Sequence, residues 1–301
     1  MLNYSGHNMS GVYVGSQEME AIYKGDQLVY HKPGTYVDVL YSGDMTSPGV
    51  SSRYHGYLTD KIQNYDMITV FPGHGNTEGA IGSKFSPKDL SENTKTHLFT
   101  LAGQGGFYLI DQILEWKNGN EFSAYPINHS VSSTCQFYNS TVSGTTAKNW
   151  RNYTNYTSGH CGISMIVGTK YYGNRDLLYS ADPLDNITLC NLSKPITAYD
   201  KLQVHIDLTY TGKSQYENGG WWTEIYNDPT NLKGFRVTGF IGAGGGAYLN
   251  QLPCKFISNT QISACNDIAY SFKWFLNSTA TPVRTKTHSL AIQEIWGVKD
   301  A

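Results

Sequence analysis

Few residues in this sequence of 301 have the types and spacings that catalysis or cofactor binding requires. The glycine-rich segment 239–246 lacks the Lys-Ser/Thr pair of a phosphate-binding loop, and the similar segment 103–106 indicates a turn or closely packed strand instead. The nine histidines form neither H-E-x-x-H nor H-x-H, G-x-S-x-G is absent, and no cysteine lies in a nucleophile motif. We therefore expect no enzyme, no metal and no cofactor. A carboxylate pair of the glycosidase type, brought together from separate strands, stays open as the enzymatic alternative because it leaves no local pattern.

Aromatic side chains offer the clearest binding chemistry. The segment 219–229 carries two adjacent tryptophans in a setting typical of a loop, and sugars bind aromatic faces flanked by amide and carboxylate groups. The candidate glycan-binding residues are Trp221, Trp222, Tyr226 and Asn227. The alternative is that one tryptophan packs in the core and the other covers an interface. The segment 150–157 mixes aromatic and polar residues in the same way and is either an adaptable contact surface or an ordinary turn.

Charge and hydropathy exclude several classes of partner. The chain has 22 basic and 24 acidic residues, a net charge of −2, and no dense basic run, so we expect no nucleic-acid binding. No stretch approaches the length of about 18 apolar residues that spans a bilayer. The N-terminus has neither the basic nor the apolar region of a signal peptide. The five cysteines are odd in number and irregularly spaced, which favours buried thiols over a disulfide framework.

The elements that would position these residues are β-strands. Runs of β-branched and aromatic residues bounded by Gly, Pro, Asn and Ser predict strands at 37–41, 67–71, 202–210 and 235–241. Helical periodicity is confined to two unclear stretches, 106–116 and 260–270. The chain is therefore predicted to be all-β.

An internal repeat divides the chain. Four blocks recur in the same order, at offsets of 138, 134, 140 and 129 residues: 38–44 with 176–182, 58–66 with 192–200, 101–109 with 241–249, and 163–170 with 292–299. The repeat predicts two tandem β-sandwich domains of jelly-roll type, at 36–172 (the first half) and 173–301 (the second half).

Residues 1–35 form a separate N-terminal element. Their pattern predicts three very short strands, the last two joined by a turn at Gly25–Asp26. A hairpin this short buries too little surface to be stable alone, so we expect it to dock on its own chain, on a symmetry mate or on another protein.

The N-terminal element resembles a segment found in tail, baseplate and fibre proteins of tailed bacteriophages. The resemblance lies in V-Y-V-G at residues 12–15 and in I-Y-K-G-D-Q-L-V-Y at residues 22–30. It implies that the element docks on the virus particle. The docking residues would be Val12, Tyr13, Val14, Ile22, Tyr23, Leu28, Val29 and Tyr30.

The repeated blocks resemble a phage module that opens like residues 39–43, continues like 62–66 and ends like 292–299. The first half departs from this pattern at its end, where Gly168-Thr169-Lys170 stands in place of Gly-Ile-Lys. Such modules lie at the outer ends of fibres, have jelly-roll-like folds and are associated with host attachment.

The resemblance implies a virion protein, a fibre or tail-associated structural protein. Its partners would be other virion proteins, further copies of itself in a homotrimer, and host surface glycan bound weakly at many sites. Two alternatives stay open. The sandwiches could contact only neighbouring virion proteins, as a head decoration or a tail-hub collar, because tyrosine is enriched at interfaces. The chain could also be a polysaccharide-degrading tail enzyme.

Overall fold

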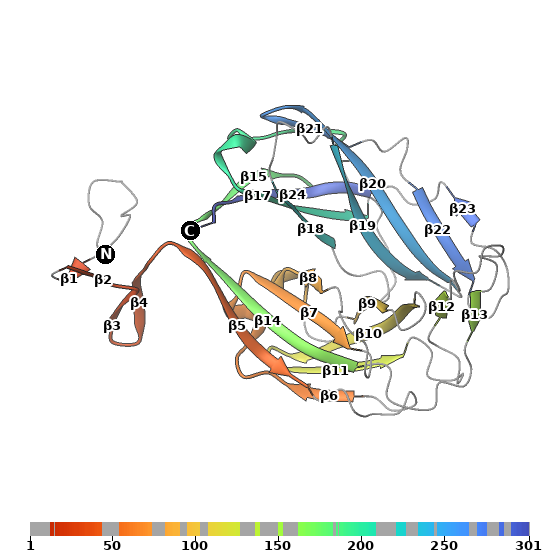
Figure 1. Ribbon diagram of the computed structural model, residues 1–301, viewed down its shortest axis with the longest axis horizontal. Coiled ribbons are helices and arrows are strands. Elements are labelled where there is room, and N and C mark those ends of the chain that lie inside the picture. The colour runs from red at the N-terminus through yellow and green to blue at the C-terminus, as the bar shows by residue number, and fades with distance from the viewer. Residues whose placement is uncertain are drawn as a thin grey trace.

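The described part of this computed structural model is all-β, with antiparallel pairing throughout and no α-helix among the described residues (Figure 1). The structure describes residues 13–14, 16–43, 54–73, 82–90, 95–102, 108–126, 136–138, 150–152, 162–182, 185, 187–208, 221–226, 234–243, 246–264, 270–275, 283–285 and 290–300. Within these ranges, no helix is long and apolar enough to cross a membrane. The predicted fold class, an all-β sandwich fold, is confirmed.

The first half contains two four-stranded sheets. The sheet that we call the first junction sheet has the order β5 (Gly34–Ser42), β14 (Gly162–Tyr172), β7 (Met67–Gly73), β8 (Ser83–Phe85). The other sheet has the order β6 (Tyr54–Tyr57), β11 (Glu121–Pro126), β10 (Tyr108–Asn118), β9 (Lys95–Ala102). A short pair, β12 (Gln136–Tyr138) with β13 (Trp150–Asn152), lies next to β10.

The second half repeats this topology. The second junction sheet has the order β15 (Arg175–Ser180), β24 (Leu290–Val298), β17 (Lys201–Leu208), β18 (Trp221–Tyr226). The other sheet contains β16 (Leu189–Asn191), β21 (Gln261–Ala264), β20 (Gly246–Ser258), β19 (Gly234–Ala243), β22 (Tyr270–Phe275) and β23 (Val283–Thr285). The junction sheets have the same strand order, and β16, β21, β20 and β19 pair as β6, β11, β10 and β9 do, as expected if the sequence repeat is a structural duplication. The second half differs in that β22 and β23 extend this sheet by pairing with β20, whereas β12 and β13 form a separate sheet.

Each half has its own apolar core, built by the alternation of side chains along its strands. The first core includes Ile68, Val70, Trp116 and Phe122, which are fully buried. The second core includes Leu202, Val204, Ile206 and Ile295 in the same way. No residue belongs to both clusters.

One local arrangement of a turn, a tyrosine and a glycine recurs in both halves, and its residues lie in two of the repeated blocks. A 3-10 turn, η1 (Ile62–Asn64) or η4 (Ile196–Ala198), is followed by a tyrosine whose ring lies flat against a strand glycine. Tyr65 covers Gly168, and Tyr199 covers Gly297. The Tyr65 hydroxyl donates to Asp38 Oδ2 at 3.1 Å, and the Tyr199 hydroxyl donates to Asp176 Oδ2 at 2.6 Å. Burial and these carboxylates raise the pKa of both tyrosines.

Three expectations need correction. The N-terminal element has four short strands instead of three: β1 (Tyr13–Val14), β2 (Gln17–Glu18), β3 (Ala21–Lys24) and β4 (Gln27–His31). The helical periodicities fall in strands, since 108–116 belongs to β10 and 261–264 to β21, where pairing on both edges overrides local preference. The tryptophan pair lies in a strand, β18, and not in a loop.

Other sequence predictions hold in the described residues. The segments 37–41, 67–71, 202–208 and 235–241 are strands, and Gly25–Asp26 joins β3 to β4 with Gly25 at φ +63°. The glycine-rich segment supplies the facing ends of β19 and β20, which form a hairpin. Two of the five cysteines, Cys190 and Cys254, are described, and both are buried thiols outside any disulfide. Burial raises the pKa of the Cys190 thiol to about 11.

Candidate functional site

In the described residues, ion pairs, side-chain hydrogen bonds and cation–aromatic contacts gather where the two halves meet. Along β17, Leu202, Val204 and Ile206 face the second core, so Gln203 and His205 point to the opposite face of the sheet. Yet Gln203 is 1% exposed and His205 is fully buried. A sheet face with polar side chains is buried only when another part of the protein covers it, and the first half covers this face of the second junction sheet.

The first junction sheet has the same two-sided burial. Ile68 and Val70 face the first core, while the alternate residues Met67 and Thr69 are also buried although neither belongs to that core. Strand β8 contacts β18, and β9 contacts β19, so the halves meet through equivalent elements. We call the contact between the two halves the junction.

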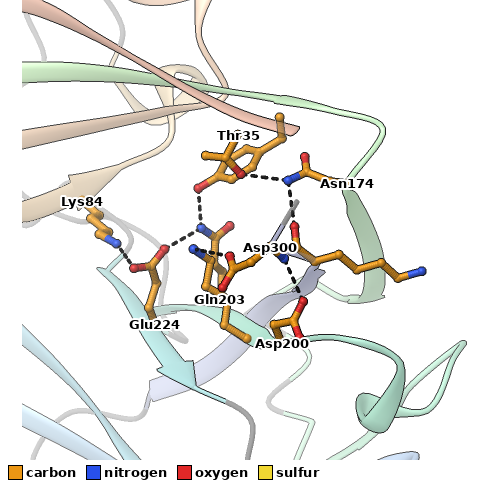
Figure 2. A network of polar contacts seen from close by, with 10 residues as sticks. Thr35, Lys84, Asn174, Asp200, Gln203, Glu224 and Asp300 are labelled. Carbon is orange, nitrogen blue, oxygen red and sulfur yellow. Dashed lines mark hydrogen bonds and ion pairs between the residues drawn. The ribbon is translucent and has the colours of Figure 1, made fainter. Parts of the chain in front are cut away.

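Gln203 is the centre of a hydrogen-bond chain across the junction (Figure 2). Its Nε2 donates to the Tyr171 hydroxyl at 2.6 Å and to Glu224 Oε1 at 2.9 Å. Glu224 in turn forms an ion pair with Lys84 of β8. The chain therefore runs from β14 of the first half through β17 and β18 of the second half and back to β8.

The charge state of Glu224 follows from this environment. Burial by itself would raise the pKa of Glu224, but hydrogen bonds from Lys84 and Gln203 and the charges of Lys84 and Lys201 outweigh burial and lower it. Burial raises the pKa of Tyr171, so the phenol stays neutral and keeps its proton. The Glu224 carboxylate is therefore ionised at neutral pH.

A second ion pair closes the junction farther along the sheet. Lys88, in the 3-10 turn η2 (Pro87–Asp89), pairs with Glu294 of β24, and Trp296 Nε1 donates to Glu294 Oε2 at 2.8 Å. Burial by itself would raise the pKa of Glu294. Hydrogen bonds from Lys88 and Trp296, together with the charges of Lys88 and His205, outweigh burial and lower it. Both carboxylates are thus fixed as ion-pair partners, and neither has the raised pKa of a general acid.

Arg175, the first residue of β15, sits among three aromatic rings. Its guanidinium carbon lies 4.1 Å from the Trp296 ring centre, 4.9 Å from that of Tyr171 and 5.5 Å from that of Trp222. Burial lowers the pKa of Arg175, while neighbouring Tyr171 and carboxylates oppose the shift. Tyr171 belongs to the first half and both tryptophans to the second, so the guanidinium packs against both halves.

The chain crosses from the first half to the second at residues 173–174, and hydrogen bonds hold this crossing in place. Gly173 adopts φ +70°, and the buried Asn174 follows it. Asn174 Nδ2 donates to Thr35 Oγ1 of β5 at 2.8 Å and to the Lys299 carbonyl at 2.9 Å (Figure 2). At the same end of the second half, the Asp300 N–H donates to Asp200 Oδ2 at 2.8 Å. The crossing is therefore bonded to β5, the first strand of one half, and to Lys299, which follows β24, the last strand of the other.

Replacing Arg175 with lysine is expected to lower the free energy of unfolding by about 1–2 kcal/mol, because an ammonium group lacks the planar surface that packs against the indole of Trp296. The matched control is Arg236→Lys in β19, an exposed arginine that donates to Gln251 Oε1 at 3.4 Å. That control should change stability by less than about 0.5 kcal/mol. Urea denaturation measures both, and equal losses would contradict the role given to the three rings.

Of the candidate glycan platform, the structure describes one side chain, that of Trp222. Trp222 is 9% exposed, and its indole stacks on His205 with ring centres 4.4 Å apart and planes 2° apart. This matches the alternative in which one tryptophan packs inside, so Trp222 offers no open face to a sugar. Trp221 and Tyr226 are at the two ends of β18, but their side chains, and Asn227 altogether, lie outside the described residues.

The N-terminal docking residues are mostly present in two short hairpins. Tyr23 is 61% exposed, while Ile22, Leu28 and Tyr30 are partly buried. Tyr13 and Val14 form β1 and Val29 lies in β4, all three without described side chains, and Val12 is not described. Lys32 forms an ion pair with Glu18 at 2.7 Å, which ties the two hairpins together.

Sequence reasoning did not find the junction. Its members Lys84, Lys88, Arg175, Gln203, Glu224 and Glu294 belong to no motif and come from six separate elements. One signal was available: Gln203 and His205 alternate with aliphatic residues in a strand between apolar runs. That alternation places the two polar side chains on one face but does not say what covers it.

Among the described residues, no group of three or more His, Cys, Asp or Glu side chains could hold a metal ion. No protein-family model and no curated protein matches the chain. The arrangement itself is suited to holding two β-sandwich halves in one orientation.

Proposed function

We propose that this chain is a non-enzymatic structural protein of a tailed-bacteriophage particle, a fibre or tail-associated protein. Its N-terminal element would dock on the particle, and its two halves would project outward to meet the host surface. We call the two halves together, residues 36–301, the body. The proposal rests on the contrast between this body, whose halves are joined by a buried junction, and the small hairpin element that lies beside it (Figure 1).

The body has the properties of a stiff spacer. Two cores, two cross-junction ion pairs and a bonded crossing oppose bending between the halves. A stiff spacer suits a projecting protein because it lowers the entropic cost of each contact at its far end. Weak contacts with host glycan would then add up over many copies, and a trimer would triple the number per projection.

The N-terminal element has the properties of a docking segment. Its link to the body runs through His31, which stacks on Tyr172 with ring centres 3.8 Å apart and meets the edge of Tyr36 at 4.1 Å. Beyond His31, the hairpin of β3 and β4 presents Tyr23 to solvent. Two-stranded hairpins are marginal alone, so a partner surface would stabilise this one.

A second role is favoured by the edges of the first half. Val37 and Val39 of β5 are 60% and 54% exposed, and Tyr57 of β6 is 70% exposed. Exposed apolar side chains on edge strands suit contacts with neighbouring proteins of the particle. The body would then be a decoration or collar and not a receptor-binding part.

Deletion of residues 1–30 is expected to abolish incorporation into particles while the body stays folded. This deletion ends before His31, so the ring contacts that cover Tyr172 and the bond between Asn174 and Thr35 remain. Incorporation is measured by quantitative immunoblotting of purified particles, and folding of the isolated protein by its melting temperature.

Point variants sharpen this test. Tyr23→Ala should reduce incorporation. Tyr57→Ala, at a tyrosine of the body that is 70% exposed against 61% for Tyr23, should not if the N-terminal element alone docks. Normal incorporation of the truncated protein would refute docking by this element. Particles that carry the full chain but gain no adsorption to host cells would favour the collar role.

A further inference from the structure

The junction differs chemically from the two cores that it connects. Both cores are apolar clusters, whereas the junction contains four cations and four anions among the described residues. The cations are Lys84, Lys88, Arg175 and Lys201, and the anions are Asp66, Glu224, Glu294 and Asp300. Among residues with described side chains, the apolar ones buried outside both cores are five: Met67, Val167, Trp222, Ala291 and Val298. Within this described set, charge pairing has a larger share in joining the halves than in folding either one.

Each glutamate faces several groups from neighbouring strands. Glu224 faces Lys84 from β8, Gln203 and Lys201 from β17, and Tyr171 from β14. Glu294 faces Lys88 from η2, Trp296 on its own strand, and His205 from β17. The charges of both carboxylates also act on Arg175 of β15, and so does that of Asp66 in the first half, whose Oδ2 accepts from the Tyr171 N–H at 2.8 Å.

The sign of the pH dependence follows from these contacts. Glu224 and Glu294 have pKa values below their ordinary value of 4.5 in the folded chain. A carboxylate with a lowered pKa contributes stability above its unfolded pKa and loses it as the pH falls through the folded value. The contribution of both glutamates is thus complete at neutral pH and is lost as the pH falls below 4.5 through their lowered folded pKa values.

Protonation would leave an excess of positive charge. At neutral pH the eight charged residues have a net charge of 0, and with both glutamates neutral the net charge becomes +2. Like charges in a partly buried contact repel strongly because water screens them poorly. Neither apolar core contains a charged residue, so neither is subject to this repulsion.

We propose that the junction is an acid-released lock: when Glu224 and Glu294 become protonated, the two halves separate at the junction while each keeps its own core. Return to neutral pH restores the ion pairs and closes the junction. The device is independent of the proposed place of the protein in a virus particle, because it rests on contacts within one chain.

The test is a pH titration of the full chain by small-angle X-ray scattering and far-ultraviolet circular dichroism in parallel. Between pH 7 and pH 3 we expect the radius of gyration to rise by roughly 10% or more before the β-sheet signal is lost. The double variant Glu224→Gln/Glu294→Gln should already be expanded at pH 7 and should respond little to acid. The control Glu121→Gln, a carboxylate of the first half that accepts from Asn118 at 3.3 Å, should behave like the original chain.

Two results would overturn the proposal. One is a radius that stays constant until the β-sheet signal itself disappears, because the halves and their cores would then come apart together. The other is a double variant that is folded and compact at pH 7. If that variant does not fold, the titration of the unmodified chain still decides, since it asks only which of the two signals changes first.

Discussion

Gly297→Ala is expected to destabilise the protein by about 3 kcal/mol, at the upper end of the usual cost of overpacking. An added Cβ would lie 2.5 Å from Tyr199 Cγ and 2.6 Å from two further atoms of the ring. The ring cannot move away easily, because Tyr199 is 6% exposed and its hydroxyl is bonded to Asp176. The change would be measured as a shift of the urea midpoint with an unchanged slope.

The chain contains its own controls for this prediction. Gly168→Ala should cost a similar amount, since its Cβ would lie 2.4 Å from Tyr65 Cδ1. Gly25→Ala should cost no more than about 1 kcal/mol, because it has a positive φ but nothing within 4 Å of an added Cβ. In a Tyr199→Ala background Gly297→Ala should cost much less, and an undiminished cost there would show that the ring is not the obstacle.

Lys84→Glu is expected to cost about 2–3 kcal/mol, because it places two carboxylates together in a partly buried site. The Lys84 side chain is 25% exposed and that of Glu224 is 20% exposed, so solvent screens the repulsion only in part. Urea denaturation of the full chain measures the loss. The surface control Lys194→Glu, opposite Asp176 with side chains 54% and 42% exposed, should cost less than about 1 kcal/mol.

The exchanged pair Lys84→Glu/Glu224→Lys should recover most of the lost stability. The amide of Gln203 can turn over, so that its oxygen accepts from a lysine at position 224 and its nitrogen no longer opposes that cation. No recovery in the exchanged pair would mean that the two side chains matter for packing and not for their charges.

The duplication explains why these two positions meet. Thr69 of β7 and Gln203 of β17 are equivalent positions in the repeat. In the register of neighbouring strands, Lys84 lies opposite Thr69, and Glu224 lies opposite Gln203. Lys84 and Glu224 therefore occupy the same place in the two halves. In a contact between identical halves this position would face its own copy and repel it, as in any two-fold interface. Opposite charges at the two sites turn that contact into an attraction.

The sequence by itself determined the class and the repeat. Alternating apolar residues predicted the strands, and the four repeated blocks correspond to equivalent strands and turns, because the side-chain period of a strand and a tyrosine lying on a glycine are local properties. The Gly25–Asp26 turn was predictable for the same reason.

The tertiary structure alone decided the site. The tryptophan pair looks like an exposed binding platform in the sequence, yet Trp222 is buried beside His205 because the first half covers that face of the second junction sheet. Lys84 and Glu224 are 140 residues apart, and neither has a neighbour in sequence that marks it. Which side chains are buried at the junction, and which residues they contact there, depends on how the two sheets pack against each other. Strand periodicity specifies only which side chains share a face.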